Sequence, residues 1–410
     1  MSRQASLRLV VAAILVGIAA ALAPHLVSRA APRSDASIKM APGVGMPGGP
    51  PTSASGLQQR VAEMEGRLQN QPNDLGAAVL LSDALLRLAR ATGDGRPANR
   101  ASTVLSAVLK ENPGQYDALK MLGAIELSQH RFREALDAGR RARDERPDDA
   151  WNYGVIGDAL VELGEYDQAF DAFDRMMSLR PSAAAYARVS YARELRGDLG
   201  GAFDAMRLAA DAAPPQDLES QAWYSTQLAE LHLKRGQLTE AVREYRRASF
   251  FYPNYPLAMA GMGKVKVEQG RRDEALAIFL DQFKRTPTLD LASRIGDLYA
   301  DMGNVAGAER YYQLAEDLAG PGLAQTESAL ALFLADHDRK LGDAVTIAER
   351  VAAKRHDIFT EDALAWAYFK AGRIGEAYSA SQQAIRTGSR DPRILSHAAA
   401  ILEAKRSRRS

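Results

Sequence analysis

The sequence predicts an all-α solenoid, a fold in which short helical units stack along the chain. The first observation is a recurring pair of small residues: six glycines at similar intervals along the chain are each followed five residues later by an alanine, as at Gly164 and Ala169. The second is the spacing of these glycines, which lie 33, 39, 34, 33 and 69 residues apart. The last step is about two periods, so a unit of about 34 residues is repeated, and this period is typical of helical solenoids.

Each unit is predicted to be two amphipathic helices joined by a tight turn. In residues 150–181, apolar residues recur at helical spacing before Gly164 and again after it. Gly164 suits the left-handed residue that ends the first helix, because glycine has no β-carbon to clash there. Gly157 and Ala169 are small enough to let the two helices cross closely, and Pro181 closes the unit because it cannot continue a helix.

These units resemble the tetratricopeptide repeat. The family's succession of apolar, small and aromatic residues is matched well at Leu119, Leu122, Gly123, Phe132, Ala135, Ala142 and Pro147. The resemblance covers roughly residues 57–405 and implies a right-handed superhelical solenoid of about nine repeats. The units are expected to begin near Leu75, Tyr116, Ala150, Ala184, Ala222, Pro256, Leu289, Gln325 and Ile358.

Three departures from the pattern mark weaker units. Residues 92–97 form an insertion in the first unit, residues 216–220 lengthen the joint before the unit at Ala222, and Arg339 stands where a turn glycine is expected. Loop insertions cost little free energy, so the array is still expected to be continuous.

The ends of the array are predicted to be capped. Residues 57–68 form an amphipathic stretch that fits a leading half-repeat, and residues 394–404 fit a closing helix. Caps are expected because the end repeats would otherwise expose an apolar face. A short basic tail follows at residues 406–410.

The N-terminus predicts export. Arg3 and Arg8 precede an uncharged apolar run at residues 9–23, which fits a secretory leader and is shorter than the roughly 20 residues that span a bilayer. Residues 1–31 are either a leader removed near Ala30 or a single anchor kept through residues 9–27, and both alternatives stay open. In either case the repeats are expected to be periplasmic, or anchored to the inner membrane and facing the periplasm.

Residues 32–56 are predicted to be a flexible linker, because they are rich in Pro, Gly and Ser and lack helical periodicity. Gly43, Gly45 and Gly48 within it have the spacing of a dinucleotide-binding loop. That motif requires a strand before it and a helix after it, and the sequence offers neither. The spacing is therefore interpreted as a chance feature of a glycine-rich linker.

Composition argues against several functions. The 52 Lys and Arg nearly balance the 51 Asp and Glu, so no net field steers the chain toward nucleic acid, and no nucleic-acid partner is expected. The chain has no cysteine, which excludes disulfides, thiolate catalysis and cysteine-zinc sites. We therefore expect neither a polyanionic partner nor cysteine chemistry.

No catalytic, cofactor or metal motif stands out. The six histidines are scattered, and the only acidic cluster around one of them is Asp336, His337 and Asp338. This cluster falls where a first helix should end, so a solvated helix terminus is favoured over a metal site. The sequence also lacks a nucleophile elbow and a Walker loop, and we expect no enzyme, no cofactor and no bound metal.

The concave surface is the predicted site of function. In the family the first helix of each unit lines this groove, and the resemblance implies ten groove residues here: Lys120, Trp151, Asp158, Arg188, Trp223, Glu230, Lys264, Asp297, Phe333 and Trp366. Aromatic side chains among mixed charges favour a protein or peptide partner. For Trp151 and Trp223 a groove position and a packing position both stay open, whereas packing is favoured for Trp366.

The family's clamp for a C-terminal carboxylate is not expected, because Lys120 is the only lysine at its repeat position and Ala124 stands where a second clamp residue belongs. An internal, extended or helical partner segment is therefore favoured. The leading interpretation is a non-enzymatic scaffold of the bacterial envelope, similar to exported tetratricopeptide proteins that assist assembly or secretion. The alternatives are a self-associating structural protein and, remotely, an enzyme built on a helical superhelix. The partner and the oligomeric state stay open.

Overall fold

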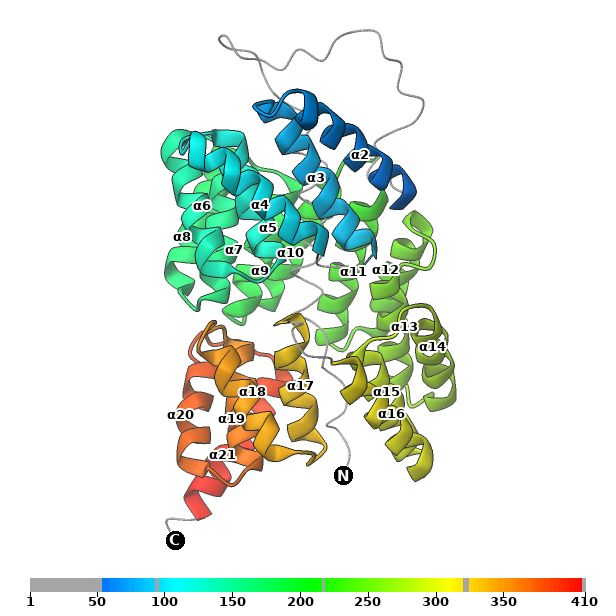
Figure 1. Ribbon diagram of the computed structural model, residues 1–410. Coiled ribbons are helices and arrows are strands. Elements are labelled where there is room, and N and C mark those ends of the chain that lie inside the picture. The colour runs from blue at the N-terminus through cyan, green and yellow to red at the C-terminus, as the bar shows by residue number, and fades with distance from the viewer. Residues whose placement is uncertain (1–53, 93–95, 216–217, 320–323, 408–410) are drawn as a thin grey trace. The chain divides into compact units, whose positions relative to one another are not determined.

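The computed structural model describes residues 54–92, 96–215, 218–319 and 324–407 (Figure 1). The predicted leader and residues 32–53 of the predicted linker lie outside these ranges. Within them the regular structure is helical throughout, with no strand. The helices are α2 (Ala54–Asn70), α3 (Leu75–Thr92), α4 (Arg96–Glu111), α5 (Tyr116–Ser128), α6 (Phe132–Glu145), α7 (Ala150–Glu162), α8 (Tyr166–Leu179), α9 (Ala183–Leu195), α10 (Leu199–Ala212), α11 (Leu218–Lys234), α12 (Leu238–Phe251), α13 (Pro256–Glu268), α14 (Arg272–Arg285), α15 (Leu289–Asp301), α16 (Val305–Leu318), α17 (Ala324–Asp336), α18 (Leu341–Ala352), α19 (Ile358–Lys370), α20 (Ile374–Ala384) and α21 (Pro392–Ser407).

The fold class is the predicted all-α solenoid of consecutive helix pairs. The odd-numbered helices from α3 to α19 are the first helices of the repeats, and six of them begin at the predicted residue: Leu75, Tyr116, Ala150, Pro256, Leu289 and Ile358. Two more, α9 and α17, begin one residue earlier than predicted. At the ends of the array, α2 covers the predicted half-repeat, and α21 covers the predicted closing helix and extends to Ser407.

The tight turns explain why the predicted starts of the helices agree with the structure. All six glycines of the repeating pattern have φ between +73° and +79°, the left-handed conformation that glycine adopts without strain. The unit that begins at α17 lacks the turn glycine and uses two other residues instead. Asp338 and Lys340, on either side of Arg339, have φ of 53° and 41°. The turn therefore forms, with the left-handed conformation imposed on residues that adopt it less readily.

The joint before α11 differs from the prediction. Residues 216–220 were expected to lengthen a loop, but α11 already begins at Leu218 and the helix is 17 residues long. No residue after Pro215 prevents helix formation, so part of the insertion extends the first helix instead of the loop.

The chain divides into two compact units, which are described separately. Among the described residues, unit 2 holds 54–92, 96–160 and 171–180, and unit 1 holds the remainder. In unit 2 the predicted close crossing is present: a β-carbon built on Gly157 would lie 2.3 Å from the Phe173 ring. The glycine therefore lets the Phe173 ring pack directly against the backbone of α7.

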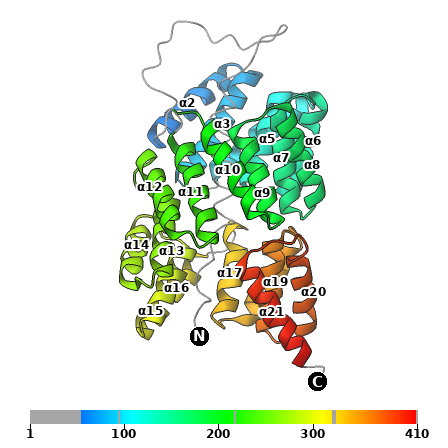
Figure 2. The same cartoon turned by 180° about the vertical axis from the view of Figure 1, so that it is seen from behind.

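In unit 1, each first helix from α9 to α19 packs against its own second helix, and several also contact the first helix that follows. Helix α11 contacts α12 and α13, and α15 contacts α16 and α17. The two views show α11 to α16 following one another as successive hairpins (Figures 1 and 2). Helices α13 and α15 pack less closely on each other than α11 and α13 do. Throughout the described ranges, no helix has both the length and the hydropathy needed to span a bilayer.

Candidate functional site

A row of polar pairs joins the first helices of successive repeats, and finally α21, in unit 1. The pairs are Lys234 with Glu194, Lys264 with Glu230, His337 with Asp297 at 2.7 Å, Trp366 with Asp336 at 2.9 Å, and His397 with Asp362 at 3.0 Å. The partners lie 30 to 40 residues apart, about one repeat. Four predicted groove residues, Glu230, Lys264, Asp297 and Trp366, belong to this set, which we call the first-helix row.

Glu230 and Lys264 are both predicted groove residues, and they form a buried charged pair within the row. The Glu230 carboxylate also accepts a hydrogen bond from the Tyr245 hydroxyl at 2.7 Å. Burial alone would raise the pKa of the Glu230 carboxyl, but Lys264 and Tyr245 hold that pKa below its usual value. Glu230 is therefore ionised at neutral pH and fixed between two donors.

An open recess lies beside this pair, between α13 and α15. Its lining includes Lys264, Arg294, Asp297 and Asp301, and it encloses about 360 Å³, a volume that includes solvent at its mouth. Arg294 is 6% exposed and donates from Nε to Asp290 at 2.8 Å. Its Nη2 atom is buried and has no hydrogen-bond partner among the described residues.

Two cations, Lys264 and Arg294, therefore share one recess with the carboxylates of Asp297 and Asp301. Burial lowers the pKa of the Lys264 ammonium, and the positive charge of Arg294 lowers it further, although Glu230 opposes both effects. A negatively charged group in the recess would offset the repulsion and supply the missing acceptor for Arg294. The recess thus offers a buried hydrogen-bond donor, the Nη2 atom of Arg294, to an anionic group.

His337 extends the row toward α17. Its Nδ1 lies 2.8 Å from the backbone oxygen of Phe333, and its ring is 4.3 Å from that of Tyr312. The Tyr312 hydroxyl donates to the same Asp297 carboxylate at 3.1 Å. Helix α17 ends at Asp336 as expected, but the expectation of a solvated histidine is wrong, because the His337 side chain is 11% exposed and bonded across the repeat.

The other two residues of the predicted acidic cluster also join repeats, since Asp336 accepts from Trp366 and Asp338 pairs with Lys370 at 2.7 Å. Across the described ranges, no group of three or more His, Asp or Glu side chains is arranged to hold a metal ion. The carboxylates of this cluster serve as acceptors between neighbouring helices.

In unit 2 the predicted groove residues Lys120 and Trp151 lie together. The Lys120 ammonium is 2.6 Å from an Asp149 carboxylate oxygen and 5.6 Å from the centroid of the Trp151 ring. Trp151 is half-buried, and its indole nitrogen has no hydrogen-bond partner among the described residues. This arrangement gives a cation over an aromatic face, a common feature of binding surfaces.

The remaining predicted groove residues are buried. Their exposed fractions are 5% for Asp158, 1% for Arg188, 3% for Trp223 and 3% for Phe333. Trp223 packs edge-on against Tyr224. Of the two alternatives that the sequence left open for it, groove or packing, the structure has packing. Trp366 also packs, as favoured, with its ring stacked 3.9 Å from that of His397. A partner could reach these side chains only if the helices moved apart.

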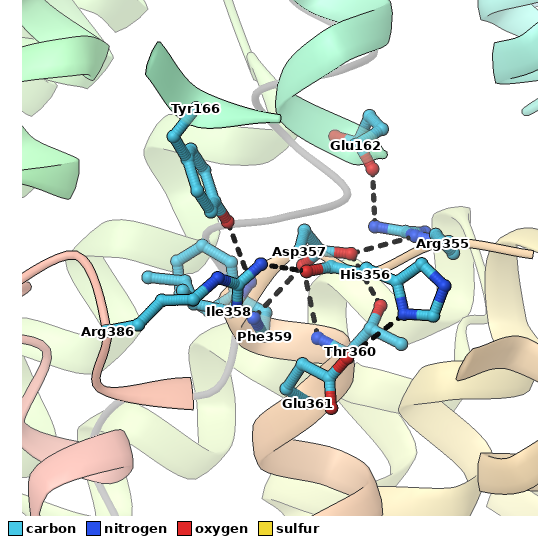
Figure 3. Close-up of polar contacts among 10 residues, drawn as sticks. All are labelled: Glu162, Tyr166, Arg355, His356, Asp357, Ile358, Phe359, Thr360, Glu361 and Arg386. Atoms are coloured by element: carbon cyan, nitrogen blue, oxygen red, sulfur yellow. Dashed lines mark hydrogen bonds and ion pairs between the residues drawn. The ribbon is translucent and has the colours of Figure 1, made fainter. Parts of the chain in front are cut away.

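Unit 1 also contains a contact between segments far apart in the sequence (Figure 3). Arg355, just before α19, pairs with Glu162 at 2.5 Å and with Asp357 at 3.0 Å. The three residues are 8%, 3% and 2% exposed. Burial alone would lower the pKa of the guanidinium, but Asp357 and Glu162 raise it above its usual value. We call this segment pairing the closure contact.

Backbone groups take part in the closure contact as well. The Tyr166 hydroxyl accepts from the Ile358 amide at 2.7 Å, across 192 residues, and the His356 amide donates to the Glu162 carbonyl at 3.2 Å. Asp357 caps α19 by accepting from the amides of Phe359 and Thr360 (Figure 3). The end of α7 and the start of α8 are therefore joined to the start of α19.

Two of the turn glycines lie where a distant backbone approaches, one of them, Gly164, within this contact. A β-carbon built on Gly164 would lie 2.5 Å from the His356 carbonyl oxygen, and one on Gly197 would lie 2.5 Å from that of Gly388. At the turn glycines Gly236, Gly270, Gly303 and Gly372 a β-carbon would meet no atom within 4 Å. Gly164 and Gly197 thus serve both the turn and the approach of a distant backbone.

Sequence reasoning missed Arg294 and the closure residues. Arg294 carries a recognisable signal, because a charged residue at a buried position of a first helix is unusual. Arg355 and Tyr166 carry no such signal, since a repeat pattern describes contacts between neighbouring repeats only.

Comparison with known families identifies the repeat. Residues 86–150 and 155–217 match the tetratricopeptide repeat family. No curated protein matches the chain.

Several solved structures are similar to this chain. The human IFIT1 dimer with PPP-AAAA is 13% identical, with a TM-score of 0.53 over 81% of this chain and 78% of that one. Yeast Tom70 is 13% identical, with a TM-score of 0.46 over 86% of each chain. A thermophilic tetratricopeptide protein of Thermus thermophilus is 23% identical, with a TM-score of 0.39 over 45% of this chain and 98% of that one. For IFIT1, whose TM-score exceeds 0.5, the likeness at 13% identity extends to the fold alone.

Proposed function

Because its repeats match the tetratricopeptide family, whose members generally bind proteins, we propose that this chain is a non-enzymatic interaction scaffold of the bacterial cell envelope. It binds an extended or helical segment of a partner protein along the first-helix row. The recess between α13 and α15 takes an acidic side chain of that segment. The envelope location rests on the apolar run at residues 9–23 and the linker at residues 32–56.

The observation that carries the proposal is the unpartnered Nη2 atom of Arg294 beside the Lys264 ammonium. Buried guanidinium nitrogens are costly to leave without an acceptor, and a carboxylate can supply one in a charge-assisted hydrogen bond. A protein is favoured over nucleic acid because the positive and negative charges of the chain balance, so no extended basic surface is expected.

The test is site-specific photo-crosslinking in envelope fractions. A photo-reactive residue replaces Asp301, which is exposed and lines the recess, and a matched one replaces Arg272, which is exposed on the second helix α14. Capture of one protein at 301 and none at 272 is the expected result. Capture that survives Arg294→Gln in a chain of unchanged melting temperature would mean that the recess is not the site.

Two other outcomes separate the alternatives. Capture of only this chain at 301 would favour self-association, and capture of nothing at either position would count against a partner on this face. The intact mass of the chain purified from envelope fractions tests the location independently. A mass lacking about 30 residues would indicate a cleaved leader, and a full-length mass in the membrane fraction would indicate an anchor.

A further inference from the structure

An exposed stripe of arginine and aromatic side chains runs along α12, the second helix of its repeat. Arg243, Arg246, Arg247 and Phe250 are all exposed and recur at the spacing of one helix face. Phe250 is 82% exposed, and Tyr252, just beyond the end of the helix, is 46% exposed. These five residues are called the α12 stripe.

The opposite face of α12 explains why the stripe points outward. Ala241, Glu244, Tyr245 and Ala248 are buried against neighbouring helices. The Glu244 side chain is only 10% exposed and lies 3.4 Å from Arg243 and 3.7 Å from Arg247. Because the Glu244 carboxylate is buried, the exposed charges of the stripe are positive. The nearest other carboxylate on the helix is that of Glu240, which is half-buried and one turn away.

Within the described ranges, Arg246 forms no ion pair, and its side chain is exposed. The half-buried Phe251 packs against the stripe: its ring lies 5.8 Å from that of Phe250 and 5.6 Å from the Arg247 guanidinium. Three arginines are therefore followed by aromatic rings over about two turns of one exposed helix face.

We propose that the α12 stripe binds the surface of an anionic phospholipid bilayer. Arginine side chains are attracted to the lipid phosphates, and aromatic rings are favoured at the level of the headgroups. The chain itself gives a reason to expect a bilayer nearby, since residues 9–27 are predicted to be an export leader or anchor and residues 32–56 a linker. The inference goes beyond the proposed function and does not depend on the partner of the first-helix row.

A bilayer fits the stripe better than a protein partner does. At 82% exposure the Phe250 ring protrudes from the surface. A protein would need a matching pocket to receive it, whereas the bilayer interface accepts a protruding ring without a matching shape. The contact is small, so it orients a chain already held near the membrane instead of anchoring it alone.

The experiment places a fluorescent reporter on the stripe in the full-length chain. Phe250→Trp is mixed with vesicles of phosphatidylglycerol and phosphatidylcholine, or of phosphatidylcholine alone, and with brominated lipids as quenchers. Val305→Trp is the matched control, because Val305 is 77% exposed at the start of α16 and has no arginine stripe beside it. Insertion of the N-terminal run affects both variants equally.

With the parent spectrum of the three native tryptophans subtracted, we expect the emission of position 250 to shift to the blue and to be quenched with anionic vesicles only, while position 305 is unchanged. Arg246→Gln in the Phe250→Trp chain should raise the lipid concentration needed for half-maximal binding by roughly fivefold, since one arginine near an anionic surface contributes about 1 kcal/mol. This variant leaves both partners of Glu244 in place. Equal responses at 250 and 305, or a response at 250 that ignores lipid charge, would overturn the proposal.

Discussion

Replacement of Arg355 by methionine tests the closure contact most directly. Arg355 lies between the carboxylates of Glu162 and Asp357, at 2.5 and 3.0 Å, and all three residues are more than nine-tenths buried. Arg355→Met fills similar space but leaves two buried carboxylates without a cation. Removing one partner from a buried ion pair typically costs about 3–5 kcal/mol, and the mutual repulsion of the carboxylates adds to that cost.

The assay combines urea unfolding with hydrogen exchange. We expect a lower urea midpoint and faster exchange of the Ile358 amide, because that amide donates across the closure contact to Tyr166. The triple variant with Arg355→Met, Glu162→Gln and Asp357→Asn should recover much of the loss, since no charge is left buried. The side-chain oxygen of the asparagine introduced by Asp357→Asn can still cap α19.

Two results would refute this reasoning. If Arg355→Met unfolds like the parent and the Ile358 amide stays protected, the ion pairs contribute nothing to the contact. If the triple variant is less stable than Arg355→Met alone, the loss arises from side-chain packing and not from unpaired charge.

Three further predictions concern packing and pH. Gly157→Leu should lower the free energy of unfolding by about 1 to 3 kcal/mol, because even a β-carbon there would lie 2.3 Å from the Phe173 ring; an unchanged melting temperature would contradict this crossing. Trp223→Ala should cost roughly 3 to 5 kcal/mol in thermal unfolding, since the ring is 3% exposed, and a loss below about 1 kcal/mol would mean that it does not pack. Burial alone would raise the pKa of Asp362, but His397 and Arg393 hold it below its usual value, so the stability it contributes is present above the unfolded pKa of about 3.9 and is lost as the pH falls further. The stability difference between the parent and Asp362→Asn should therefore shrink below about pH 4 in denaturant titrations, and a difference independent of pH would contradict it.

Most of the repeat structure could be predicted from the sequence, because the signals for it are local. A glycine at the left-handed turn position and small residues at the crossing set the phase of each unit, and that is why α13 and α15 begin at the predicted residues. The start of α11 was predicted four residues late, since the insertion before it contains no helix breaker after Pro215. In the turn between α17 and α18, where the glycine is absent, Asp338 and Lys340 take the left-handed conformation instead.

The candidate site could be predicted only in part. The repeat register places Glu230, Lys264 and Asp297 on one face of successive first helices, and the structure joins the first two directly. The same register places Trp223 there, but it cannot indicate how far a ring turns into the packing between helices. The recess depends on how loosely α13 and α15 pack, a feature of three-dimensional spacing that has no counterpart in the residue pattern.

The closure contact limits how this repeat protein can change during evolution. A linear array tolerates the gain or loss of a repeat, because each unit touches only its neighbours. Here the segment at Glu162 and Tyr166 must meet the segment at Arg355 and Ile358, across 192 residues. Adding or deleting one unit of about 34 residues between them would carry the two segments away from each other. The contact therefore requires a fixed number of repeats between Tyr166 and Ile358, whereas it places no such requirement on repeats outside that interval.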